Sequence, residues 1–151
     1  MTVGRQLVTD PKWSLKIKEI LYATNMTPLS DAALQYAISL AQENQARLIM
    51  LNVQLKPKTG ELVDAKRFEN SNLRRLQGLI PPDVELGRQP YCIVEIGDPA
   101  EKILETAGEH KADMIVLGIR PHSVTAATNL LQPTVHRVIA GATCPVLTVR
   151  G

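Results

Sequence analysis

The chain has 151 residues, of which 44% are hydrophobic and 3% aromatic, and its formal net charge is +2. This length suits one domain with a full, aliphatic core. The small net charge gives no reason to expect nucleic acid or an acidic membrane as a partner. The longest apolar runs are about four residues, far short of the roughly 20 that span a membrane. The amino terminus lacks the profile of a signal peptide, so we expect a cytoplasmic protein.

The first half of the sequence alternates strand and helix patterns. Apolar runs predict the first two strands, within residues 17–24 and over residues 47–53. Between them, Thr27-Pro28 can open a helix. The buried face of that helix is predicted from helical spacing of Ala33, Leu34, Ala37, Ile38 and Ala41. A polar helix is predicted over residues 65–80, ended by Pro81-Pro82, and a third strand over roughly residues 89–96.

The second half of the chain contains the clearest local signals. In the run 97–101, Asp98 can cap a helix, Pro99 fits its first position, and Glu101 can reach back to the cap. The continuous apolar run 113–118 predicts a strand buried on both faces. After an irregular segment, a helix is expected near Thr134 and a last strand over residues 145–149.

Five strands that alternate with four helices predict an α/β fold, a five-stranded parallel doubly wound sheet with helices on both faces, similar to the Rossmann fold. In such sheets a ligand lies beyond the carboxyl ends of the strands, where the strand order reverses. The candidate site positions are therefore residues 24–26, residues 52–53, and the segment from Gly118 onward.

The sequence resembles the universal stress protein (UspA-like) family. The first half of the resemblance lies in residues 20–27, the Ala-Ala-Leu of residues 32–34, and Leu51-Asn-Val53. The second half lies in Gly97-Asp-Pro99, the Ala-Asp-(apolar)4-Gly pattern of residues 112–118, and residues 144–150 with their Cys-Pro-Val-Leu motif. The resemblance implies a domain over residues 17–151 with the adenine nucleotide alpha hydrolase-like fold, and residues 1–16 as an amino-terminal arm or a linker. It also implies a homodimer, and membership of either an ATP-binding or a non-binding branch.

The ATP-binding branch of this family has an Asp at the end of the first strand, where this chain has Asn25. That branch also has the motif Gly-x2-Gly-x9-Gly-(Ser/Thr) after the fourth strand. Gly118 and Thr134 match its two ends, whereas Pro121 and Pro133 replace the inner glycines, with a gap of 11 residues instead of nine. The resemblance gives these nucleotide-binding candidates: Thr24, Asn25, Met26, Val53, Gly118, Arg120, Thr134 and Val135.

The two prolines weaken the predicted phosphate site. A proline fixes φ near −65° and has no N–H to donate. Two lost charge-assisted hydrogen bonds, at about 1.5–3 kcal/mol each, would turn micromolar affinity into millimolar. Side chains of Arg120, His122 and Arg137 could compensate. Asn25 and Thr134 also have a structural interpretation, as turn or cap residues.

No motif supports a particular reaction, so we expect no catalytic residue and lean against an enzyme. The three histidines show no metal-binding spacing, and the HxGH, GxSxG and Walker motifs are absent. Cys92 and Cys144 form no CxxC and are predicted to be buried thiols. We expect no bound metal and no cofactor, with ATP as the alternative.

The last predicted strand, residues 146–149, would lie at a sheet edge if the family's strand order holds. An exposed apolar edge is a liability unless another chain covers it, so we expect a homodimer through Val146, Leu147, Thr148 and Val149. A protein partner or a tandem stress-protein domain is also expected. Two functions compete: a non-enzymatic, dimeric stress-response module with a degenerate nucleotide site, and a divergent adenine-nucleotide sensor or slow ATPase.

Overall fold

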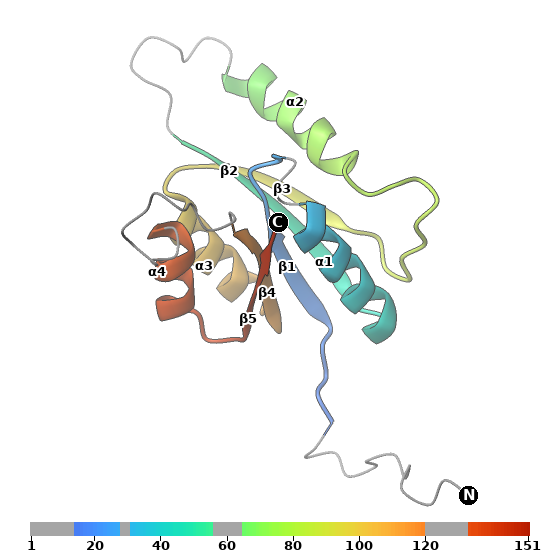
Figure 1. Ribbon diagram of the computed structural model, residues 1–151. Helices are drawn as coiled ribbons and strands as arrows, with labels where there is room; N and C mark the ends of the chain where they lie inside the picture. Colours follow the sequence, from blue (N-terminus) through green and yellow to red (C-terminus); the bar gives the residue numbers. More distant parts are fainter. Residues whose placement is uncertain (1–13, 28–30, 56–64, 120–132) are drawn as a thin grey trace, which may run out of the picture.

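The computed structural model describes residues 14–27, 31–55, 65–119 and 133–151. Strands and helices alternate along these residues (Figure 1), as the sequence predicts. Their bounds are β1 Glu19–Ala23, α1 Asp31–Asn44, β2 Arg47–Gln54, α2 Ala65–Gln77, β3 Tyr91–Ile96, α3 Pro99–Glu109, β4 Met114–Ile119, α4 Pro133–Gly141 and β5 Val146–Arg150.

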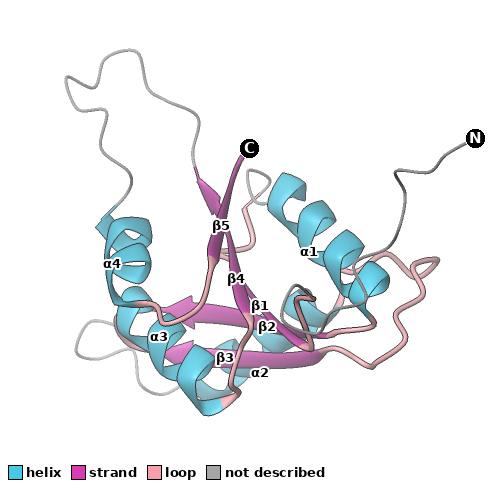
Figure 2. Ribbon diagram, turned by 90° about the horizontal axis from the view of Figure 1, so that it is seen from below, coloured by secondary structure: helices cyan, strands magenta, loops and turns pink. Residues whose placement is uncertain are grey.

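The strands form one parallel sheet in the order β3-β2-β1-β4-β5, which confirms the predicted doubly wound architecture. Helices α1 and α2 cover one face of the sheet and α3 and α4 the other (Figure 1 and Figure 2). The strand order reverses at β1, which pairs with β2 on one side and with β4 on the other. Ala23, near the carboxyl end of β1, is the register partner of both Leu51 and Leu117.

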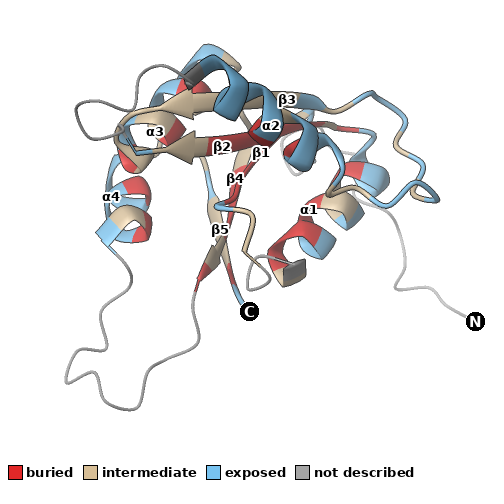
Figure 3. Cartoon of the chain, turned by 90° about the horizontal axis from the view of Figure 1, so that it is seen from above, coloured by how far each residue is buried: buried red, intermediate tan, exposed pale blue. Residues whose placement is uncertain are grey.

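The central strands β1, β2 and β4 are buried over much of their length (Figure 3). Each of them contributes alternate side chains to two separate cores, one on each face of the sheet. In β1, Ile20 and Tyr22 pack beneath α1, while Leu21 and Ala23 pack beneath α3 and α4. Full burial of an aliphatic side chain such as that of Ile20 or Leu21 stabilises the fold by roughly 1.5–3 kcal/mol. Packing against the two cores holds the central strands in register, so that the carboxyl ends of β1, β2 and β4 lie at the same end of the sheet.

Local signals set several of the helix ends. The predicted start of α3 is confirmed, since Asp98 is its N-cap and Pro99 its first residue. Helix α2 ends at Gln77, three residues before its predicted end at Ile80. Helix α1 begins at Asp31, and the predicted start at Thr27-Pro28 falls partly on residues 28–30, which lie outside the described residues.

β5 is an edge strand, as predicted, because it pairs only with β4 within the described sheet. Its side chains are partly buried, and Val149 is buried against the core beneath α1. None of the helices in the described ranges has the length and apolar character needed to cross a membrane.

Candidate functional site

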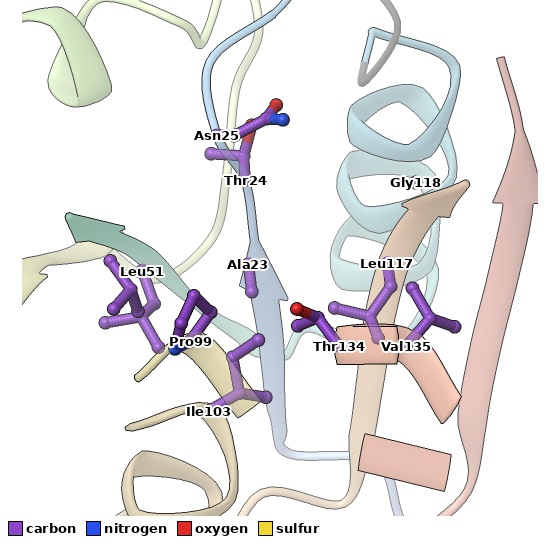
Figure 4. A pocket seen from close by; sticks show the side chains of 11 residues that line it. Ala23, Thr24, Asn25, Leu51, Pro99, Ile103, Leu117, Gly118, Thr134 and Val135 are labelled. Carbon is purple, nitrogen blue, oxygen red and sulfur yellow. The ribbon is translucent and has the colours of Figure 1, made fainter. Parts of the chain in front are cut away.

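A pocket of about 200 Å³ opens where the strand order reverses, beyond the carboxyl ends of β1, β2 and β4 (Figure 4). Two further walls come from the first turns of α3 and α4. Eleven described residues line it: Ala23, Thr24, Asn25, Leu51, Val53, Pro99, Ile103, Leu117, Gly118, Thr134 and Val135. The walls are mostly apolar, and none of these eleven side chains is charged.

Six of the eight predicted nucleotide-binding candidates line this pocket: Thr24, Asn25, Val53, Gly118, Thr134 and Val135. Met26 is not among the lining residues, and its φ of 61° places it in the left-handed region just beyond the strand. Arg120 lies outside the described residues, as do Pro121 and His122. The structure thus brings together candidates from the turn after β1 and from β2, β4 and α4 that are up to 111 positions apart in the sequence (24 to 135).

Hydrogen bonds hold the end of β1 against β2. The Thr24 N–H donates to the Leu51 carbonyl over 2.9 Å, and Asn52 Nδ2 donates to the Thr24 carbonyl over 2.8 Å. Asn52 is fully buried, and its Oδ1 accepts from Gln54 Nε2. Burial of an amide is tolerated here because both of its polar ends have partners. Asn52 does not itself line the pocket, but it holds the lining residue Thr24 against the end of β2.

The turn after β1 uses the side-chain oxygens of two of its own residues. Thr24 Oγ1 accepts from the Met26 N–H at 2.9 Å. Asn25 Oδ1 accepts from both the N–H and the hydroxyl of Thr27, at 3.2 and 2.8 Å. These bonds define a local turn of the kind that Asn and Thr favour. The oxygen of Asn25 thus already has the structural role that its sequence context predicts.

An exposed ion pair joins Asp98, the N-cap of α3, to Arg137 of α4, and neither residue lines the pocket. Asp98 Oδ2 accepts from the Glu101 N–H at 2.9 Å, and Asp98 Oδ1 accepts from Arg137 Nη1 at 2.9 Å. The Glu101 N–H and the guanidinium of Arg137 lower the pKa of Asp98. Arg137, which the sequence suggests as a phosphate contact, is therefore engaged with a carboxylate.

Sequence reasoning missed five lining residues: Ala23, Leu51, Pro99, Ile103 and Leu117. Three of them are apolar residues at or near the carboxyl ends of parallel strands, and the other two lie in the amino-terminal half of α3. Strand alternation was the available signal for the first three, because side chains at alternate positions share one face.

The chain offers little other reactive chemistry in the part that the structure describes. No group of histidine, cysteine, aspartate and glutamate side chains is arranged to hold a metal ion there. Cys92 and Cys144 are half-buried rather than buried as predicted, because each lies near the start of an outer strand or just before one. Burial raises the pKa of both thiols.

The fold and the position of the pocket define a class: α/β domains that place a ligand at the reversal of a parallel sheet. The sequence model of the Universal stress protein family matches residues 16–150. The chain is 31% identical to Universal stress protein YxiE of Bacillus subtilis, over 87% of this chain and 98% of that protein. The chain therefore belongs to the universal stress protein family.

Solved structures agree with this fold. Universal stress protein UspA from Lactobacillus plantarum superposes with a TM-score of 0.68 at 22% identity, over 91% of this chain and 100% of that one. A universal stress protein in complex with cAMP superposes with a TM-score of 0.64 at 21% identity, over 90% of this chain and 99% of that one.

Proposed function

We propose that this protein is a non-enzymatic, dimeric stress-response module that keeps the ligand pocket of its fold but has a degenerate nucleotide site. The observation that carries the proposal is the start of α4. Its first residue is Pro133, followed by the pocket residue Thr134. A helix amino terminus binds phosphate through free N–H groups, and proline has none.

The dimer is proposed to form through β5. This strand is at the edge of the sheet and runs over the apolar sequence Val146-Leu147-Thr148-Val149 before Arg150. An edge strand of this kind is a template for pairing with another chain. Pairing of two copies about a two-fold axis would cover both edges with one symmetric contact.

The second candidate is an adenine-nucleotide sensor or slow ATPase, with ATP as its ligand. The pocket itself favours it, since Gly118 and Thr134 lie in one lining with the polar end of β1. Structural neighbours described as complexes with cAMP and with dAMP also favour it. These neighbours are 21% and 15% identical to this chain.

The proposal also includes a partner other than a second copy of the chain. The module is proposed to act in the cytoplasm through a protein partner or a tandem stress-protein domain, with residues 1–16 as the arm or linker. Nucleic acid and membranes are not proposed as partners, because the net charge of the chain is only +2.

Sedimentation equilibrium tests the dimer, and product analysis tests the absence of catalysis. The proposal expects a species of twice 16.6 kDa at tens of micromolar protein and no release of ADP or AMP from ATP. A purely monomeric protein would contradict the dimer. Product release that disappears in Asn25→Ala or Thr134→Ala would support the sensor or ATPase instead.

A further inference from the structure

Helix α2 lies over β2 and β3 and is exposed along most of its length (Figure 3). Among its described side chains only those of Asn72 and Leu76 are buried, on the side that packs against the two strands. The sheet therefore uses a narrow part of this helix, and the rest of its surface is open to another molecule.

Part of that open surface has a composition unlike that of an ordinary solvated helix. Five exposed residues recur at positions i, i+1, i+4, i+7 and i+8, so they share one side of α2: Arg67, Phe68, Ser71, Arg74 and Arg75. We call these five residues the arginine stripe. At 1.5 Å per residue the stripe is about 12 Å long. Glu69, the one acidic residue of α2, falls on the opposite side of the helix.

The three arginines of the stripe have no ion-pair partner in the part of the chain that the structure describes. Other arginines of the protein are engaged. Arg47 and Arg88 both pair with Glu19, at 2.8 and 3.2 Å, and Arg137 of α4 pairs with a carboxylate at 2.9 Å. A guanidinium group binds a carboxylate through two parallel hydrogen bonds. The stripe therefore offers three such groups that the protein itself leaves unused.

The stripe also contains the single phenylalanine of the chain. Phe68 is 55% exposed, whereas Tyr22 in the core is 1% exposed. Aromatic residues and arginine are enriched in protein–protein interfaces, where they supply many of the residues that dominate binding. An exposed aromatic ring among unpaired arginines thus matches the composition of a docking surface.

From these observations we propose that the arginine stripe of α2 docks an acidic, amphipathic segment of a partner protein. Carboxylates of the partner pair with the three arginines, and an apolar side chain of the partner packs on Phe68. Single-stranded nucleic acid is bound along a basic groove that follows many phosphates, and a stripe about 12 Å long is too short for that. The inference rests on the proposed function in one respect, because it names the chemistry of the protein partner proposed there.

Fluorescence anisotropy of the full chain tests the proposal. The probe is a fluorescein-labelled peptide of Glu, Ala and Leu, with Leu at helical spacing on one side and Glu on the others. The wild type should bind this peptide with saturation below millimolar protein. Phe68→Ala and the double variant R74Q/R75Q should each raise the Kd about tenfold. A second peptide, with Ala in place of every Leu, keeps the carboxylates and should bind the wild type and Phe68→Ala equally.

Two variants serve as matched controls. Ile139→Ala removes another exposed apolar side chain, from α4 on the other face of the sheet, and K16Q/K18Q removes two positive charges ahead of β1. Both should bind the peptide as the wild type does. Circular dichroism should show that every variant is folded.

Three results would overturn the inference: no binding of the Leu-containing peptide up to millimolar protein, an unchanged Kd in folded Phe68→Ala, or tighter binding of an RNA oligomer or of anionic vesicles than of the peptide. Sedimentation equilibrium of the same variants separates this inference from the proposed dimer. Loss of peptide binding in a protein that still dimerises would leave the dimer intact. A monomeric wild type that binds the Leu-containing peptide as described would support the docking surface and contradict the dimer alone.

Discussion

The proposed dimer through the edge strand β5 can be tested by a single substitution that removes one backbone N–H from that strand. The Ile115 N–H donates to the Pro145 carbonyl at 2.9 Å, and the Gly151 N–H donates to the Ile119 carbonyl at 3.2 Å. Alternate residues of a parallel strand point their backbone groups to the same side. Because residues 145 and 151 face β4, the N–H of Thr148 points to the free edge.

Thr148→Pro removes that N–H without removing a hydrogen bond to β4, and proline is tolerated in an edge strand at such a position. In a two-fold dimer each chain loses one donor. Two backbone hydrogen bonds at about 1 kcal/mol each correspond to a dimer Kd that rises roughly 30-fold, and the proline ring adds to this loss.

Sedimentation equilibrium over a range of protein concentrations measures the effect. Thr148→Val is the matched control, because it keeps the N–H and the branched shape of the side chain and should leave the dimer Kd close to that of the wild type. Circular dichroism should show that the proline variant is folded. A folded Thr148→Pro protein that dimerises as tightly as the wild type would refute pairing through β5.

Further predictions concern the core, an ion pair and a thiol. Asn72 of α2 is 2% exposed and its Nδ2 has no hydrogen-bond partner, so Asn72→Leu should raise the free energy of unfolding in urea by about 1–3 kcal/mol. A loss of stability would mean that this amide is satisfied in solution. The pKa of Asp98 is lowered from 3.8, so the carboxylate stabilises the fold above that pH, and its contribution is lost as the pH falls through the lowered pKa. Asp98→Asn should therefore be less stable than the wild type at neutral pH, with the difference closing below pH 3.8 in urea titrations; a difference independent of pH would contradict this. Burial raises the pKa of Cys92, so the thiol should react with iodoacetamide more slowly than free cysteine at pH 8, as mass spectrometry can measure; equal rates would contradict its burial.

Most of the fold could be predicted because its signals are local. Asp98, Pro99 and Glu101 stand at fixed spacing, and the predicted start of α3 was confirmed. The apolar run of β4 indicated a strand buried on both faces, and Ile115, Val116 and Leu117 are indeed buried. Helix α2 was harder to delimit. Leu79 and Ile80 continue its apolar pattern, although they lie beyond its end and pack against the core beneath α1.

The site could be predicted only in part, because contacts between distant residues decide its chemistry. Six of the eight predicted candidates line the pocket. The pairing of Asp98 with Arg137, 39 residues apart, has no signal in a single sequence, and it gives the guanidinium of a candidate phosphate contact a carboxylate partner. The buried Asn72 was missed for a similar reason, since a polar residue in a polar helix gives no sign of facing the sheet.

Titration calorimetry of the purified protein with Mg-ATP, beside a mass-spectrometric search for nucleotide carried over from the host, tests the central claim most directly. A degenerate phosphate site predicts no heat up to millimolar ATP and no copurified nucleoside phosphate. Binding of ATP at low micromolar affinity would contradict the account, because it would mean that Pro133 and the Asp98–Arg137 pair leave a working phosphate site.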